Sequence, residues 1–304
     1  MVSAFSSFRE RVLGTRNSNA LLWNLRAAEV QELGPGVTLR PLGGPVAPLD
    51  LSKAGEAGFL EWQVLVPMAP HLESEIESID IGATTSGFDT RSRGWLGFCL
   101  LLLRGCGRAL PVAISGTSWS QLPGLAGKKH LDAPFSDATL LEDYRLHFRG
   151  SSSTDELEVT SEKALWVRGK FNSFNELAHK SPAFRYALEA SFDWRYSHDV
   201  RASIARIWGG IEALFEINAE LTYRLSISAA SLLTPRGAQR VARYSEIKRM
   251  YAQRSKAVHG AQLDDRSLSA TLDQSFVLLR DLLVYAADRG RVFDETDILS
   301  AIME

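Results

Sequence analysis

The chain has 304 residues, of which 45% are hydrophobic and 23% are charged. This length and composition are enough for two domains with buried cores, and they exclude a disordered polymer. The formal net charge is −2, which excludes a protein covered in basic charge. Any contact with nucleic acid must therefore come from a local basic patch.

The first residues and the longest apolar run bear on the location of the protein. Residues 1–16 carry charges at Arg9, Glu10 and Arg11 without an apolar segment, so we expect no signal peptide. The longest apolar run, residues 95–103, is shorter than the about 20 residues of a membrane span. These features predict a cytoplasmic protein that does not enter a membrane.

The sequence contains two cysteines, Cys99 and Cys106, with neither CxxC nor zinc-site spacing. We interpret them as buried thiols in a reducing compartment, and we predict no metal and no other cofactor.

Residues 149–155 are small, polar and flexible, and they separate regions of different periodicity. They predict a domain at 1–150 and a second at 156–304. In the first half we expect a helix at 19–32 and a loop at 115–129. Short apolar or β-branched runs bounded by Gly and Pro favour strands, although such runs also fit buried helices; they lie at 37–42, 59–66, 95–103 and 110–115. The first half is thus predicted to be a β-rich α+β domain.

The first half holds no recognisable catalytic motif such as a P-loop or G-x-S-x-G. Its histidines, His71, His130 and His147, are scattered, and we interpret them as structural. The aromatic residues Trp95 and Trp119 fit either a core or a ligand pocket.

The second half has helical periodicity throughout and predicts an antiparallel all-α bundle. Asp199 and Asp294 are predicted N-caps, as is Thr234, which precedes a proline suited to the first helical turn. The predicted helices are 161–178, 182–192, 199–217, 219–233, 235–258 and 265–288, with a short one after Asp294.

One predicted helix places an arginine among apolar residues. With Tyr244 at zero, Ile247, Tyr251 and Val258 fall at about 300°, 340° and 320°, and we expect this side to be buried. Arg254 falls at about 280°, on the same side. A permanently charged guanidinium there needs a partner such as Glu212, a cleft or a subunit interface, unless it extends to solvent.

His259 falls at about 60°, at the end of the same helix and next to Gly260, a natural residue after a C-terminus. The negative end of the helix dipole favours a protonated imidazole there. An ordinary histidine at a helix end fits this position as well.

A basic run surrounds Arg254. Between residues 236 and 256, seven basic residues minus one acid, Glu246, leave a local charge of about +6, which suits phosphate binding but also fits a solvated helix face. The basic residues are Arg236, Arg240, Arg243, Lys248, Arg249, Arg254 and Lys256.

The pair Arg254-x4-His259 matches the R-x4–6-H motif of the HEPN superfamily. Three sequence segments in order resemble its ApeA-like branch more closely: IEALF at 211–215, SAASLL at 228–233 and YAQRSKAVHG at 251–260. The resemblance covers roughly residues 160–290 and implies an all-α HEPN helical bundle. Ser255, which follows the motif arginine, is the usual choice of that branch, whereas the wider superfamily often has Asn, Asp or His.

The resemblance implies a metal-independent endoribonuclease of a toxin–antitoxin or anti-phage defence system. The expected assembly is a homodimer in which two motifs face each other, and the partners are RNA and an antitoxin or defence-complex protein. Arg254 and His259 would be catalytic, supported by Glu212 and Ser255. From the basic run we expect RNA contacts from Lys256, Arg249, Lys248 and Arg243. The alternative is a non-catalytic HEPN module that binds RNA, a nucleotide or a protein.

Overall fold

The computed structural model describes residues 15–54, 66–81, 92–128, 135, 137–141, 157–197, 199–215, 221–260 and 263–303. Two compact units are present: Met1–Arg145 with Ser153–Asn172, and Leu146–Ser152 with Ser173–Glu304. The division falls inside one helix, α5 (Ser161–Lys180). The predicted linker at 149–155 lies outside the described residues, so the domain limits at 150 and 156 stay a prediction.

The first unit contains a six-stranded antiparallel sheet in the order β2-β3-β4-β1-β5-β6. Its α+β class is therefore confirmed. The central strand β1 pairs with β4 on one side and with β5 on the other, and Ala20 lies opposite both Ile76 and Ile114. The strands are β1 (Thr15–Trp23), β2 (Gln31–Gly34), β3 (Val37–Pro41), β4 (Leu72–Ile81), β5 (Leu110–Ser115) and β6 (Thr139–Leu140).

The strand predicted at 95–103 is wrong, because these residues form the helix α4 (Arg93–Leu103). Ser92 caps this helix by accepting the backbone N–H of Trp95 at 3.1 Å. Gly97 lets α4 approach β3, because a Cβ there would lie 3.0 Å from a methyl of Val37. All ten residues from Gly94 to Leu103 are buried, so no polar face reveals the helical period.

The helix predicted at 19–32 is also wrong, because β1 and β2 occupy its two ends and no helix lies between them. Residues 20, 21 and 22 are all buried, so β1 is covered on both faces and lacks the alternation that marks a half-exposed strand. The strands predicted at 37–42 and 110–115 are confirmed as β3 and β5. The strand predicted at 59–66 lies outside the described residues except for its last residue, which begins η1 (Val66–His71).

Short helices complete the described part of this unit. One, α2 (Pro48–Ser52), was not predicted. The predicted loop at 115–129 contains the 3-10 turns η2 (Trp119–Gln121) and η3 (Leu125–Gly127).

Two tryptophans singled out in the first half belong to its core. Trp95 and Trp119 are buried, and the Trp119 indole N–H donates to the backbone oxygen of Asn19 at 2.8 Å. Cys99 and Cys106 are buried too, in line with the predicted buried thiols. His71 packs edge-on against Trp23, while the other two histidines singled out in this half, at 130 and 147, lie outside the described residues.

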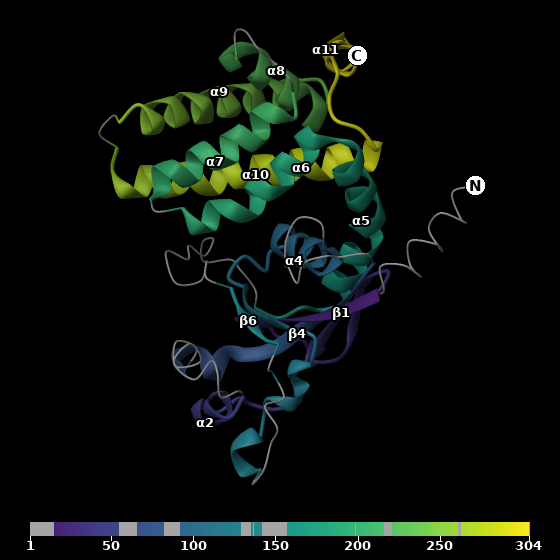
Figure 1. The fold of residues 1–304 in the computed structure, drawn as a ribbon. Coiled ribbons are helices and arrows are strands. Elements are labelled where there is room, and N and C mark those ends of the chain that lie inside the picture. The colour runs from purple at the N-terminus through teal and green to yellow at the C-terminus, as the bar shows by residue number, and fades with distance from the viewer. Residues whose placement is uncertain are drawn as a thin grey trace, which may run out of the picture. The chain divides into compact units, whose positions relative to one another are not determined.

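The described part of the second unit contains helices and no strand, which confirms the predicted all-α class of this half. Helix α6 packs on α7, α7 packs on α9 and α10, and α8 packs on α9 (Figure 1). The helices after α5 are α6 (Pro182–Asp193), η5 (Trp194–Tyr196), α7 (Val200–Ala213), α8 (Leu221–Leu233), α9 (Ala238–Val258), α10 (Asp265–Arg289) and α11 (Glu295–Met303).

Two of the three predicted N-caps are confirmed. Asp199 accepts the N–H of Ala202, and Asp294 accepts the N–H of Asp297, each at 2.8 Å. The cap predicted at Thr234 is wrong: α9 begins three residues later than expected, after Gly237, which has a φ of 131°. The backbone N–H of Thr234 donates instead to Ala230 and closes the end of α8.

Candidate functional site

An arginine and a glutamate form the centre of the site. Nη2 of Arg254 on α9 lies 3.1 Å from Oε1 and 3.4 Å from Oε2 of Glu212 on α7. Both side chains are mostly buried, with 21% and 24% exposed. Of the alternatives considered for Arg254, the structure shows the pairing with Glu212. It satisfies a charge that would be costly to bury alone.

Aromatic side chains surround this ion pair. The Tyr251 hydroxyl donates to Oε1 of Glu212 at 3.4 Å, and the guanidinium of Arg254 lies 5.4 Å from the centre of the Tyr251 ring. Trp208 packs edge-on against that ring at 5.2 Å. Burial raises the pKa of Tyr251, the Glu212 carboxylate raises it further, and Arg254 partly opposes them, so the phenol remains a hydrogen-bond donor.

The guanidinium keeps one donor uncommitted. The Nε of Arg254 is buried, and none of the described residues accepts a hydrogen bond from it. The side-chain oxygen of Gln253 is likewise buried without a donor among the described residues. An unmade hydrogen bond of this kind costs about 1–3 kcal/mol, and a binding or catalytic role is one explanation for such a group.

Arg254 faces inward because the buried side of α9 is centred on it. Ile247, Met250, Tyr251 and Ala257 are buried, and they span about 220° to 340° around the helix, with Arg254 at about 280°. The prediction that Val258 is buried is wrong, since 42% of it is exposed. Val258 falls within the arc, at about 320°, but it is the last residue of the helix.

His259 lies at the C-cap of α9 and is exposed. Its backbone N–H donates to the carbonyl of Ser255 at 3.0 Å, and Gly260 follows with a φ of 75°, as expected for a helix stop. No hydrogen bond or ion pair joins the His259 ring to a described residue, Arg254 included. Within one chain, the imidazole is thus open to solvent while the guanidinium is held inward.

The structure divides the predicted basic run. Arg243 pairs with Glu246 at 2.8 Å, and Arg240 donates to the carbonyl of Ala301 at 2.8 Å. Arg236 donates to the carbonyl of Met303 at 3.0 Å. Lys248, Arg249 and Lys256 are exposed and make no hydrogen bond or ion pair with the described residues.

Of the four residues predicted to bind RNA, three therefore present an exposed charge without an ion-pair partner among the described residues: Lys248, whose ammonium lies 5.8 Å from the centre of the Tyr244 ring, Arg249 and Lys256. Arg243, the fourth, is 21% exposed and occupied by its carboxylate partner. Ser255 is half-buried, and its backbone carbonyl, rather than its hydroxyl, is what contacts the motif histidine.

Sequence reasoning missed two contacts near the site. Tyr251 was placed on the buried side, but its hydrogen bond to Glu212 depends on where α7 lies. Arg201 on α7 donates to the carbonyl of Ala257 at 2.8 Å, which satisfies one open carbonyl of the last turn of α9. The position of Arg201 in the first turn of α7 gives no sign of this contact.

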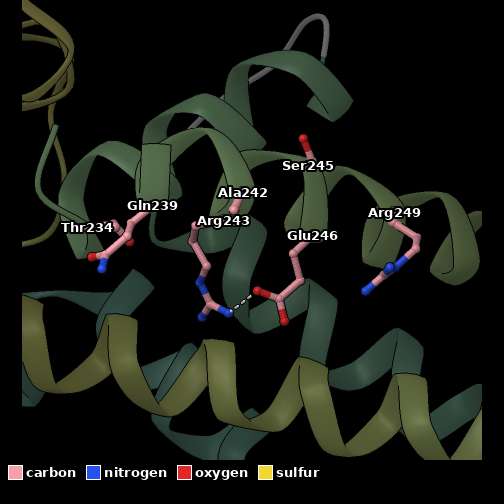
Figure 2. Close-up of a pocket in the computed structure, with 7 residues that line it drawn as sticks. All are labelled: Thr234, Gln239, Ala242, Arg243, Ser245, Glu246 and Arg249. Carbon is pink, nitrogen blue, oxygen red and sulfur yellow. Dashed lines mark hydrogen bonds and ion pairs between the residues drawn. The ribbon is translucent and has the colours of Figure 1, made fainter. Parts of the chain in front are cut away.

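A pocket of about 680 Å³ lies along α9. Figure 2 shows the side chains of Arg243, Glu246 and Arg249 extending from α9 on one side, with Thr234 and Gln239 at one end. Its lining residues are Thr234, Gln239, Ala242, Arg243, Ser245, Glu246 and Arg249. The sequence did not predict this pocket.

Within the described ranges, no three His, Cys, Asp or Glu side chains gather as metal ligands would. The helices of those ranges include none with the length and apolar character of a membrane span.

Comparisons of the chain with protein-family models, with curated proteins and with solved structures gave no match.

Proposed function

We propose that the chain is a HEPN-type endoribonuclease that cleaves RNA without a metal ion, as a cytoplasmic toxin or anti-phage effector. The observation that carries the proposal is the Arg254–Glu212 pair, in which a mostly buried arginine keeps an unused N–H five residues before an exposed histidine on the same helix. The resemblance of residues 160–290 to ApeA-like HEPN domains supplies the reaction.

The two residue types suit cleavage by the ribose 2′-OH. The 2′-oxygen attacks the adjacent phosphorus while its proton leaves to a base, and the bond from phosphorus to the 5′-oxygen breaks. Arg254 would stabilise the negative charge on the phosphoryl oxygens, since a guanidinium does not titrate. His259 would protonate the departing 5′-oxygen. The products are a 2′,3′-cyclic phosphate and a 5′-hydroxyl.

The proposal includes a homodimer with two motifs at one groove. In a single chain, Arg254 is on the buried side of α9 and His259 is exposed. A second copy could bring its His259 toward the phosphate held by the first. An antitoxin or defence-complex protein would then act by covering this groove or keeping the two copies apart.

Cleavage of RNA in EDTA tests the proposal. End-labelled tRNA and mRNA should be cut by the wild-type chain to fragments with 2′,3′-cyclic phosphate ends. Arg254→Ala and His259→Ala should each lower the rate at least about 100-fold. Matched controls are Arg266→Ala and His179→Ala, which remove exposed residues on α10 and α5 and should keep the rate. A wild-type chain that cuts no faster than the two motif variants would refute the proposal.

A non-catalytic HEPN module is the second candidate, and the ion pair itself favours it. Arg254 is already neutralised by Glu212, which fits a structural role for the arginine. In that case the chain binds RNA or a nucleotide in a binding assay and leaves it intact. The Arg254→Ala variant binds the same ligand equally well.

A further inference from the structure

The pocket along α9 has a polar lining of mixed charge. Arg243 and Arg249 are cationic, whereas Glu246 is anionic, and Asp281 lies 3.8 Å from Arg243. The lining itself has two cations and one anion, a net charge of +1, and Asp281 outside it is also paired with Arg280 at 2.9 Å. Because the Glu246 carboxylate stands among the cations and would repel a phosphate, a neutral group with both donors and acceptors fits this lining better.

Several polar groups of this lining are uncommitted. The Arg243 guanidinium holds Oε2 of Glu246 at 2.8 Å, while Oε1 has no partner among the described residues. Arg249 is exposed and forms no hydrogen bond with them, and neither do the side chains of Thr234 and Gln239. Figure 2 shows the Glu246 carboxylate between the two guanidinium groups. The pocket thus presents a fixed acceptor with donors on both sides.

We propose that this pocket binds a guanine base of the RNA substrate, an inference that rests on the proposed ribonuclease function. Among the four bases, guanine alone has two neighbouring N–H donors on its Watson–Crick edge, and a carboxylate accepts both. Its O6 and N7 accept from an arginine. Adenine, cytosine and uracil each present an acceptor there, which the Glu246 carboxylate repels.

The size and place of the pocket suit a base next to the cleavage site. With about 680 Å³ open to solvent, it is a surface groove with room for a base and its ribose. Glu246 and Arg254 are eight residues apart on α9, or about 12 Å along its axis. One or two nucleotides of single-stranded RNA can span that length.

Binding of free nucleosides tests the pocket without any cleavage. Titration calorimetry on the full chain should show guanosine binding at least about tenfold more tightly than inosine, which lacks the 2-amino group, and than adenosine. Glu246→Gln should abolish the preference for guanosine over inosine. Ala242→Trp should block all nucleosides by filling the pocket without changing its charge. Val241→Trp is the matched control, because residue 241 is exposed and does not line the pocket.

A cleavage assay distinguishes failure of the guanine-binding pocket from failure of the proposed ribonuclease function. Oligonucleotides that carry one guanosine should be cut at a fixed distance from it. The Glu246→Gln variant should cut the same oligonucleotides at several positions, without a fixed distance from the guanosine. If RNA is cut without regard to guanosine, and guanosine does not bind, the pocket proposal is overturned and the ribonuclease stands. If guanosine binds with the stated preference and no RNA is cut, the base-binding pocket stands and the ribonuclease is refuted.

Discussion

Arg254 occupies the middle of the buried side of α9, where most helices have an apolar residue. The chain tolerates it because Glu212 supplies the opposite charge and the Tyr251 ring lies beside the guanidinium. Removing either charged partner would leave the other mostly buried and unpaired. The two residues should therefore contribute to stability as a pair rather than separately.

A double-mutant cycle of Glu212→Gln and Arg254→Gln should give a coupling energy of about 1 kcal/mol or more, because both groups are mostly buried. Urea denaturation measures the four unfolding free energies. The exposed pair Lys180–Glu176, 69% and 67% exposed, is the control and should give at most about 0.5 kcal/mol. Equal coupling in both cycles would contradict the interpretation.

Tyr251 should make stability depend on pH in the alkaline range. Burial and the Glu212 carboxylate raise its pKa in the folded chain, so above about pH 10 the unfolded chain releases this proton first. The stabilisation is present below pH 10 and is lost as the pH rises toward the raised pKa. The difference in unfolding free energy between wild type and Tyr251→Phe, measured from pH 8 to 11, should stay level and then fall. A difference that grows above pH 10 would contradict this.

At the scale of elements, the sequence predicted the helices that are buried on one side only, and it failed for a helix and a strand whose buried residues follow one another without a break. The apolar stripe of α10 predicted that helix to within one residue at each end. Asp199 predicted the start of α7, although α7 ends at Ala213 and not at residue 217. The periods of α4 and β1 are hidden, because residues 94–103 of α4 and 19–22 of β1 are buried without a break. Hydrophobic periodicity needs a polar face as its contrast.

The candidate site could be predicted only in part from the sequence. The angular position of Arg254 around its helix left open a buried partner, a cleft, a subunit interface or extension to solvent, and only the structure shows Glu212 as its partner. The pocket was beyond reach, because it needs Thr234 beside α9, and the turn that sets the start of α9 was predicted wrongly. Gly237 adopts a positive φ there, which the sequence alone did not reveal.

Helices α6 and α7 lie so close that a single methyl group should matter. A Cβ at Gly210 would lie 2.8 Å from the Cβ of Ala190 and 3.2 Å from the backbone of Ala187. Gly210→Ala should therefore lower the unfolding free energy by about 1–3 kcal/mol, despite the higher helix propensity of alanine. Gly169 on α5 is the matched control, since nothing lies within 4 Å of its Cβ position, and Gly169→Ala should stabilise by up to about 1 kcal/mol. Urea denaturation of both variants measures these changes, and equal shifts would refute the packing argument.

At the scale of the whole molecule, the core of the first unit includes residues that come more than a dozen positions after its last strand in the chain. The backbone of Arg26 pairs with Leu157 and Val159, at 2.9 and 2.8 Å. Phe171 lies so close to Gly34 that a Cβ there would be 2.4 Å from its ring. The start of α5 is therefore part of the first core.

Fragment stability tests this division. A fragment of residues 1–172 should unfold at a higher temperature than one of residues 1–150, which lacks Phe171 and the backbone pairing of Arg26. Burial of the phenylalanine alone is worth about 1.5–3 kcal/mol. Circular dichroism during heating measures both transitions. Equal transition temperatures would place the limit of the first unit at residue 150 instead.

The continuity of α5 also bears on how this chain could have been assembled in evolution. Domains are usually exchanged at loops, where a crossover leaves both partners whole. Here the limit between the units lies within a helix, so a crossover at that point would split one hydrogen-bonded ladder between two genes. We therefore expect the two units to be inherited together, and a homologue that carries only one of them to keep a complete helix in place of α5.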